Sequence, residues 1–460
     1  MHRRAIAAVI SCLVSVSFCL AGPPGAAKDG YEISVAPGRD SGIYRAGEKI
    51  AFAVSVTRDG KALKEGQVSY QIVAGGTRTL KQGTLPLAAD GAKVQTELAE
   101  AGCVAMRATY KLDGNAQIRA EAGATVDPNR IRPSLPPPDD FDEFWSRQRK
   151  RLTDAPATPK LTPVQAPKVS WGPQVECFDV QVDCPGGKPL SAYFARPKDA
   201  KPGSLPAILS FHGAGVHSSS LMSTAGYAAR GMLGMDVNAH GLPNGKPKDF
   251  YSALLAGELR GYPTRGMDSR DTCYLLGMYL RLMRAMEFIT SQPEWDGKTL
   301  AVRGSSQGGA QAIVAAGLDA RVTILSAGLP GLCDLTAGEA NRAAGWPVGK
   351  RKLTGKQLGT LRYFDVCNFA ARTKATAIVR VGLIDHTCWP SGVLAACNQL
   401  KGPRHILTTP NSGHSWTPRE AYTKADTLFW KLLDEQRKAA TPSQPAQSRD
   451  GALPAAKGGR

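Results

Sequence analysis

Hydrophobic and polar residues alternate along the first part of the chain, from residue 31 to residue 126. In 50–56 (IAFAVSV) and 68–73 (VSYQIV) nearly every second residue is apolar, which is the period of a β-strand with one buried face. Asp-Gly and Gly-Gly pairs separate these runs at intervals typical of hairpins. About seven short strands in roughly a hundred residues predict a small immunoglobulin-like β-sandwich.

After a proline-rich stretch at 129–138, the pattern becomes that of an α/β domain. Short apolar runs typical of buried parallel strands alternate with longer stretches of helical period. The expected strands are 175–182 and 190–195, which form a hairpin, followed by 207–211, 234–237, 299–303, 322–327, 377–381 and 405–408. The expected helices are 139–152, 274–290, 309–317 and 421–433. This alternation predicts a mostly parallel, doubly wound sheet with helices on both faces.

The two ends of the chain differ from the middle in composition. Residues 1–21 have a basic start, an apolar run and a small residue at the end, which is typical of a secretory signal peptide. From residue 438 onward Pro, Ser, Gln, Ala and Gly predominate, so 438–460 is expected to be a disordered tail. The predicted organisation is therefore a signal peptide at 1–21, a β-sandwich at 29–128, a linker at 129–138 and a catalytic domain at 139–437 before the tail. The protein is expected to be secreted or periplasmic, without a membrane span.

Charge and cysteine content narrow the classes of partner and cofactor. The formal net charge of +18 is consistent with an ordinary solvated basic surface, and attraction to acidic polysaccharide or cell envelope remains a less favoured alternative. No basic run is interleaved with aromatic residues, so nucleic acid is not expected as a partner. The ten cysteines form no CxxC pair and no Cys/His cluster at zinc spacing, so neither a metal nor a cofactor is expected.

The most specific chemical signal lies between the strand at 299–303 and the helix at 309–317. There the sequence reads Gly304-Ser305-Ser306-Gln307-Gly308-Gly309, a G-x-S-x-G pattern. Placed between a strand and a helix, this pattern is typical of the sharp turn that exposes a nucleophilic serine. Glycine is needed on both sides because a Cβ atom would clash in so tight a turn. Ser306 is the predicted nucleophile.

A serine nucleophile needs a general base, and the base needs a carboxylate that fixes its tautomer. In this fold the order along the chain is Ser, Asp, His. His414 lies in a loop between the strand at 405–408 and the last helix, where the base is expected. Asp385 follows the strand at 377–381 and is the favoured acid, with Asp334 and Asp365 as rivals. The oxyanion donors are expected to be the backbone amides of Gln307 and Ala214, with His212 holding its own loop by hydrogen bonds.

Several motifs occur in a fixed order between residues 132 and 435. They are 141–145 (FDEFW), 261–266 (GYPTRG), 304–309 (GSSQGG), 362–365 (RYFD), 368–372 (NFAAR), 382–388 (GLIDHTC) and 413–414 (GH). In these motifs the chain resembles the acetyl xylan esterase and cephalosporin-C deacetylase family, carbohydrate esterase family seven. The resemblance implies an α/β-hydrolase fold, removal of acetyl groups from sugar esters, the triad Ser306, Asp385 and His414, and a tendency toward homo-oligomers.

The chain departs from this family at three places that bear on substrate binding. Asn238-Ala239-His240 stands where the family has Arg-Gly-Gln, Ser415 follows the catalytic histidine where the family has glutamate, and Ala214 replaces a tyrosine. We therefore expect Asn238, His240 and Trp389 to set part of the sugar specificity. For Trp389, stacking on a sugar and packing in the core are equally open.

The leading hypothesis is an exported serine esterase that hydrolyses acetylated carbohydrates through an acyl-enzyme. One alternative is a peptidase of the prolyl-oligopeptidase kind, which shares the fold and the triad order. Another is a non-catalytic carbohydrate-binding protein on a hydrolase fold, although all three triad positions are filled. The β-sandwich has few aromatic residues for sugar binding, so a spacer role is favoured for it.

Overall fold

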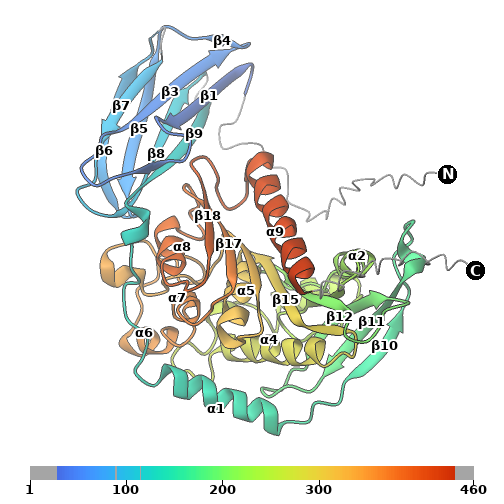
Figure 1. The fold of residues 1–460 in the computed structure, drawn as a ribbon. Helices are drawn as coiled ribbons and strands as arrows, with labels where there is room; N and C mark the ends of the chain where they lie inside the picture. The colour runs from blue at the N-terminus through green and yellow to red at the C-terminus, as the bar shows by residue number, and fades with distance from the viewer. Residues whose placement is uncertain (1–27, 89–90, 114–115, 441–460) are drawn as a thin grey trace, which may run out of the picture.

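The computed structural model describes residues 28–88, 91–113 and 116–440 (Figure 1). The predicted signal peptide at 1–21 and residues 441–460 of the predicted tail lie outside this range. Within it, the chain forms a β-sandwich followed by a larger α/β domain, as the alternating patterns predict. No helix among these residues is long and apolar enough to cross a membrane.

The N-terminal domain contains two packed sheets. One has β1 (Tyr31–Pro37), β3 (Ile50–Arg58), β4 (Lys61–Ala62) and β7 (Ala92–Thr96). The other has the order β2 (Ile43–Tyr44), β9 (Gln117–Val126), β8 (Gly102–Lys111), β5 (Gln67–Ala74) and β6 (Arg78–Pro86). Alternate residues such as Phe52 and Ile72 are fully buried between the sheets. The β-sandwich prediction is confirmed, and the additional strands are mainly the two-residue β2 and β4.

The first helix, α1 (Phe141–Asp154), attaches the linker to the catalytic domain. Asp142 and Glu143 lie in the first turn and Arg151 lies in the last, which matches the helix dipole, whereas the final residue, Asp154, does not. Phe144 and Trp145 are buried against Phe364, and the indole Nε1 of Trp145 donates a hydrogen bond to the carbonyl of Tyr363. These aromatic residues pack in the core, as expected.

The catalytic domain is organised around one large sheet. In order across the sheet its strands are β10 (Lys160–Val164), β11 (Val175–Val182), β12 (Leu190–Pro197), β14 (Leu233–Val237), β13 (Leu205–Phe211), β15 (Trp295–Ser305), β16 (Ile324–Gly328), β17 (Thr376–Gly382) and β18 (Arg404–Thr409). The strands from β14 to β18 pair in parallel, and those from β10 to β12 pair antiparallel. The mostly parallel sheet is thus confirmed. The edge strand β10 escaped the sequence pattern because its residues are mainly exposed.

Helices cover both faces of this sheet (Figure 1). One face packs against α1, α4 (Tyr274–Thr290), α5 (Gln307–Leu318), α7 (Val366–Ala370) and α8 (Pro390–Cys397). The other packs against α2 (Leu221–Ala229) and α9 (Arg419–Ala440). The short helices α3 (Lys248–Ala256) and α6 (Gly355–Leu361) belong to excursions between strands. Helix α9 continues to Ala440, so the structured region extends beyond the predicted boundary at residue 437.

The two domains are joined by direct hydrogen bonds. The amide of Gly123 donates to the carbonyl of Pro410 at 2.8 Å, and the Thr408 hydroxyl donates to the carbonyl of Ser41 at 2.8 Å. Figure 1 shows the N-terminal domain standing over the end of the large sheet that carries β17 and β18. The sandwich therefore contacts the part of the sheet whose strand ends carry Asp385 and His414.

Candidate active site

Ser306 lies at the turn between β15 and α5. Its backbone has φ of 56° and ψ of −124°, a conformation that costs energy for a residue with a side chain and is found mostly at functional sites. A Cβ atom on Gly304 would lie 2.3 Å from the carbonyl oxygen of Gly308, and one on Gly308 would lie 2.0 Å from that of Phe211. Only glycine fits at both positions, which is why the pattern could be recognised in the sequence.

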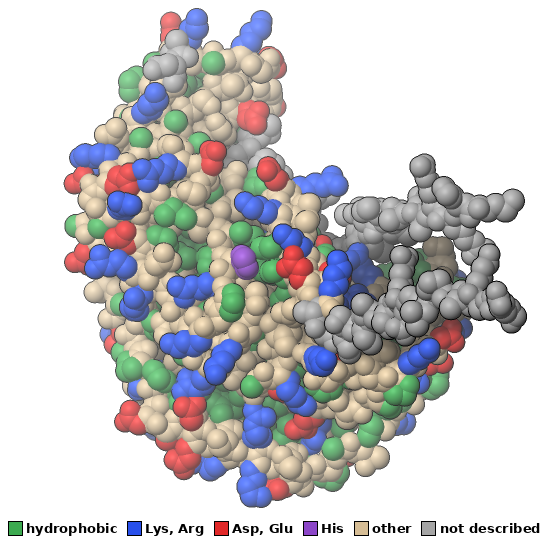
Figure 2. All heavy atoms as spheres, in the orientation of Figure 1, with side chains coloured by type: hydrophobic (Ala, Val, Ile, Leu, Met, Phe, Trp, Pro, Cys, Tyr) green, Lys and Arg blue, Asp and Glu red, His purple; other side chains and the backbone are tan. Residues whose placement is uncertain are grey.

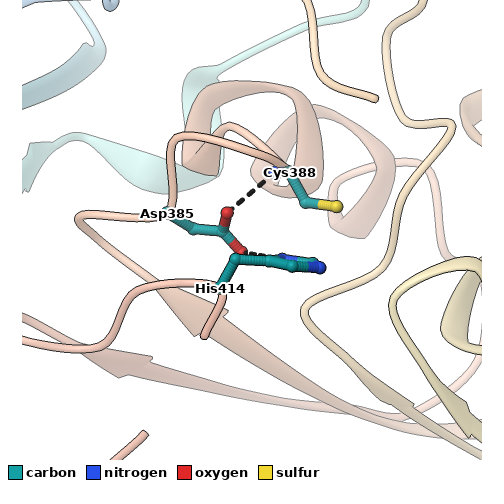
Figure 3. Close-up of side chains that lie close together, drawn as sticks. All are labelled: Asp385, Cys388 and His414. Carbon is teal, nitrogen blue, oxygen red and sulfur yellow. Dashed lines mark hydrogen bonds and ion pairs between the residues drawn. The ribbon is translucent and has the colours of Figure 1, made fainter. Parts of the chain in front are cut away.

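Ser306, His414 and Asp385 come together at the carboxyl ends of three strands (Figure 3 shows the latter two). The hydroxyl Oγ of Ser306 is 2.9 Å from Nε2 of His414, and Nδ1 of His414 is 2.8 Å from Oδ2 of Asp385. Asp385 is fully buried, whereas the His414 side chain is 23% exposed. The arrangement therefore presents a hydroxyl, a base and a buried carboxylate in sequence, with the hydroxyl end accessible.

The carboxylate of Asp385 is fixed by backbone donors. Its Oδ1 accepts hydrogen bonds from the amides of Thr387 and Cys388, both at 2.8 Å. These bonds leave Oδ2 directed at the imidazole ring (Figure 3). A buried carboxylate held by several donors can orient a histidine and stabilise its protonated form.

The two rival aspartates have other partners. Asp365 accepts hydrogen bonds from the amides of Asp334, Leu335 and Cys367. Burial, together with the nearby charge of Asp334, raises the pKa of Asp365 to about 7. Asp334 is buried and bonded to Arg342 and Ser134. Both carboxyl groups hold the chain around residue 334 and the start of α7.

The donor atoms of Asp385, Cys388 and His414 lie within 4.8 Å of one another, which raises the question of a metal site. Each is already engaged: Asp385 by two amides and a histidine, and His414 by Ser306 and Asp385. Burial raises the pKa of the Cys388 thiol well above its usual range, so it is protonated and a poor ligand. The cluster is accounted for by hydrogen bonding around Ser306.

Two backbone amides beside Ser306 are candidates for binding an oxyanion. Gln307 is the first residue of α5, where helical N–H groups have no partner within the helix. The loop after β13 passes close by, since a Cβ on Gly213 would lie 3.9 Å from the Cβ of Ser306. The next residue, Ala214, is exposed. The Gln307 amide and the loop that carries Ala214 thus lie near Ser306, and the assignment of the two amides as oxyanion donors stays a prediction.

Tyr262 connects these two segments, a role that the sequence analysis missed. Its buried hydroxyl donates to Oε1 of Gln307 at 2.7 Å and accepts a hydrogen bond from the amide of Gly215 at 3.3 Å. Burial raises the pKa of Tyr262 to about 12, so the hydroxyl keeps the proton that it donates. The GYPTRG motif was the available signal, but a motif does not reveal which distant groups its tyrosine contacts.

The residues proposed for substrate binding at 238–240 are buried. Asn238 accepts hydrogen bonds from the amides of His240 and Leu242 and donates to the carbonyl of His217. His240 donates from Nε2 to the carbonyl of Gly215 at 2.8 Å, and its Nδ1 accepts from the Tyr274 hydroxyl. Burial lowers the pKa of His240 to about 4. These polar atoms are used to hold the loop that carries Ala214, which does not favour direct contact with a sugar.

His212 also serves this loop. Its Nδ1 donates to the carbonyl of Gly213 at 2.7 Å and its Nε2 accepts from the amide of Ala239 at 3.1 Å. Burial lowers its pKa well below the ordinary value, so the ring is neutral and both nitrogens keep these roles. This is the loop-holding position that the sequence analysis expected.

Two tryptophans have positions that the sequence could not give. Trp389 is half-buried at the start of α8, in edge-to-face contact with His386 and close to Gly76 of the N-terminal domain. Trp346 lies beside the candidate oxyanion site, because a Cβ on Gly331 would be 3.3 Å from its indole, 3.5 Å from Sγ of Cys388 and 3.9 Å from the amide nitrogen of Gln307. An indole and a thiol thus lie close to Gly331, in the neighbourhood of that amide.

Known proteins with a similar sequence are acetyl esterases. The model of the family described as acetyl xylan esterase (AXE1) matches residues 129–433. The acetyl esterase Axe7A of Xylanibacter ruminicola is 30% identical over 407 residues, which cover 86% of this chain and 88% of that protein. The match thus extends well into the N-terminal domain.

Solved structures agree with the sequence comparison. The acetyl xylan esterase from Paenibacillus sp. R4 superposes with a TM-score of 0.57 at 26% identity and covers 67% of this chain and 98% of its own. Acetyl xylan esterase 1 from Thermoanaerobacterium sp. JW/SL YS485 has a TM-score of 0.56 at 25% identity, with coverage of 66% and 97%. Both are similar over a part of this chain about the size of its catalytic domain.

Proposed function

This chain belongs to the acetyl xylan esterase family, and we propose that it is an exported serine esterase that removes acetyl groups from carbohydrates through an acyl-enzyme. The observation that carries the proposal is the continuous chain of hydrogen bonds from the Ser306 hydroxyl through His414 to the buried Asp385. The names of its relatives support an acetyl ester of a sugar as the substrate class. Export rests on the predicted signal peptide.

In the acylation step, neutral His414 accepts the proton of Ser306 while Oγ attacks the ester carbonyl carbon. The amides of Gln307 and Ala214 then bind the negative oxygen of the tetrahedral intermediate, and Asp385 stabilises the imidazolium. When the intermediate collapses, His414 gives its proton to the sugar oxygen and the carbon–oxygen ester bond breaks. The products of this step are a free sugar hydroxyl and acetyl-Ser306.

In the deacylation step, a water molecule takes the place of the sugar. His414 accepts a proton from the water, whose oxygen attacks the acetyl carbonyl, and the same two amides bind the oxyanion. Collapse breaks the bond to Oγ, and His414 returns the proton to Ser306. Acetate leaves and the enzyme is restored.

The surroundings of Gln307 support a preference for small acyl groups. Trp346 and Cys388 lie close to Gly331, which itself lies near the Gln307 amide, so they are the candidates for limiting the length of the acyl chain. A hydrophobic pocket separates groups that differ by one methylene by only about 1–3 kcal/mol, so butyryl esters should react more slowly than acetyl esters without being inert.

The test is acetate release from a panel of acetylated oligosaccharides, with Ser306→Ala as the inactive control. Ser306→Ala should fold normally and lose essentially all activity, because removing a triad member costs many powers of ten in rate. Labelling with a fluorophosphonate should modify Ser306, and the neighbouring Ser305 serves as the internal comparison. A label on Ser305 alone, or cleavage of peptide amides at a rate comparable to acetyl esters, would overturn the proposal.

A further inference from the structure

A large groove lies between the two domains, and none of the triad residues lines it. Its volume is about 1010 Å³, and both domains contribute to its walls. The segment that forms part of one wall, from Leu383 to Trp389, also carries Asp385. The groove is therefore separate from Ser306 but next to the loop that completes the active site.

One wall of the groove is a face of the five-stranded sheet. Gln71 and Val73 of β5 lie opposite Arg107 and Ala105 of β8, and these alternate residues point to the same side. Thr79 of β6 continues this face next to Val73. The side chains are short or polar, so the wall is open to a hydrated ligand and offers little apolar surface to a protein.

The opposite wall carries an excess of positive charge. Among the lining residues five are Lys or Arg and two are Glu, and the cations of the catalytic domain are Arg342, Lys350, Arg351 and Lys352. Residues 350–352 are exposed. Glu121 already pairs with Arg107, and Asp334 pairs with Arg342. The three cations at 350–352 then face one remaining lining acid, the exposed Glu339. Figure 2 shows Lys and Arg side chains on both sides of the junction between the domains.

Arg342, which also lines the groove, is already held by other residues. One of its terminal nitrogens bonds Asp334, the Ser134 hydroxyl and the carbonyl of Arg132. Its Nε is buried and has no partner in the described part of the chain. The charge of Arg342 is therefore already balanced by Asp334, and the cations that remain available to a ligand are the exposed residues at 350–352.

Aromatic side chains complete the groove. Trp389 and His386 both line it, with ring centroids 4.9 Å apart and planes at 74°. The amide of Ala343 bonds the carbonyl of Gly75 at 2.8 Å, and the Thr77 hydroxyl bonds the carbonyl of Asn341 at 2.7 Å, so the two walls are fixed. A preformed groove loses less entropy on binding than one that must be assembled.

We propose that this groove binds a sugar chain that carries uronic acid groups, and so selects acidic acetylated polysaccharide for the esterase. The carboxylates would face the cations at 350–352, and a sugar face would lie against the indole of Trp389. This inference rests on the proposed function, since the polysaccharide bound in the groove would also have to present its acetyl groups to Ser306. A single tryptophan provides no series of stacking platforms, which disfavours single-stranded nucleic acid.

The experiment measures binding by full-length Ser306→Ala protein in isothermal titration calorimetry. The probes are a xylo-oligosaccharide bearing glucuronic acid and a neutral xylo-oligosaccharide of the same length. We expect the acidic probe to bind about tenfold more tightly at low salt, and the difference to shrink as salt is added. Replacing Lys350, Arg351 and Lys352 with Gln should remove that difference, while Trp389→Ala should weaken both probes.

The matched control removes three exposed cations from α9, namely Arg419, Lys424 and Lys431, again with Gln. This control should bind like the parent protein. Equal affinity for both probes, loss of selectivity in the α9 control, or equally tight binding of duplex DNA would overturn the proposal. The esterase proposal is judged separately, by hydrolysis of p-nitrophenyl acetate by the unmodified protein, because this small ester does not need the groove.

Discussion

The substitution Tyr262→Phe tests whether a tyrosine outside the triad positions the oxyanion site. It removes one hydroxyl that bonds two segments, Gln307 of α5 and the loop at Gly215, and leaves the ring in place. The Nε2 atom of Gln307 already has no partner among the described residues, so Oε1 would lose the only bond recorded for this side chain. We expect the Gln307 side chain then to shift, and the backbone N–H of the same residue to shift with it.

The magnitude follows from two comparisons. Loss of a complete oxyanion donor lowers kcat by about 10²–10³. Tyr262 acts through position rather than by donating to the oxyanion, so we expect a smaller fall, about tenfold to a hundredfold in kcat, with KM nearly unchanged. Leaving Oε1 unpaired in the buried site should also lower the free energy of unfolding by about 1–3 kcal/mol.

Tyr279→Phe is the matched control. Its buried hydroxyl donates to the carbonyl of Phe364 at 3.0 Å, in the helical layer beneath the sheet. This variant should lose a similar amount of stability in urea denaturation while keeping kcat for p-nitrophenyl acetate. If Tyr262→Phe lost stability but kept its full kcat, or if both variants lost kcat equally, the positioning role would be refuted.

Three further predictions address the acid, the acyl pocket and the loop that carries Ala214. Asp385→Asn should lower kcat by about 10⁴, because the tautomer of the base is disturbed. Asp365→Asn should mainly lower stability. The reverse result in steady-state assays would assign Asp365, and not Asp385, as the acid of the triad. Trp346→Ala should raise the ratio of kcat/KM for p-nitrophenyl butyrate over acetate, and an unchanged ratio would exclude this indole from the acyl pocket. The pKa of His240, lowered by burial to about 4 from the ordinary 6.5, makes its neutral form part of the fold. Protonation therefore favours the unfolded chain, and stability present above pH 6.5 should be lost as the pH falls toward 4, by up to about 3 kcal/mol in urea denaturation; His240→Gln should show a shallower loss, and an equal one would contradict the assignment.

Local sterics explain why Ser306, the candidate nucleophile, could be located from the sequence. A Cβ atom at Gly304 or Gly308 would clash with backbone atoms of the turn itself or of the adjacent end of β13. The spacing of the two glycines therefore marks the turn in the sequence. Asp385 and His414 could be placed because strand ends in a parallel sheet meet at one edge. The choice among Asp334, Asp365 and Asp385 could not be made from order alone, because it depends on which carboxylate meets the imidazole and which caps a helix.

Contacts between segments that are far apart in the chain could not be predicted from the sequence. Asn238 and His240 lie after a strand end, where substrate contact is a reasonable expectation, but their burial depends on how the 212–217 loop folds over them. Trp346 reaches Gly331 from an excursion that has little regular structure. Trp389 lies against Gly76, more than three hundred residues earlier, so its neighbour is set by the docking of two domains.

The docking of the N-terminal domain also changes the interpretation of that domain. A spacer would contact the catalytic domain loosely, yet Gly123 lies so close to Leu383 that a Cβ there would be 2.3 Å from its carbonyl oxygen. Glu121 bonds His386, which is adjacent to Asp385 in the chain. The sandwich therefore contacts the chain on both sides of Asp385, at Leu383 and His386, while the amides of Thr387 and Cys388 hold the carboxylate itself. Because packed interfaces are stiff, these contacts favour a role for the β-sandwich in keeping Asp385 aligned with His414 over that of a loose spacer.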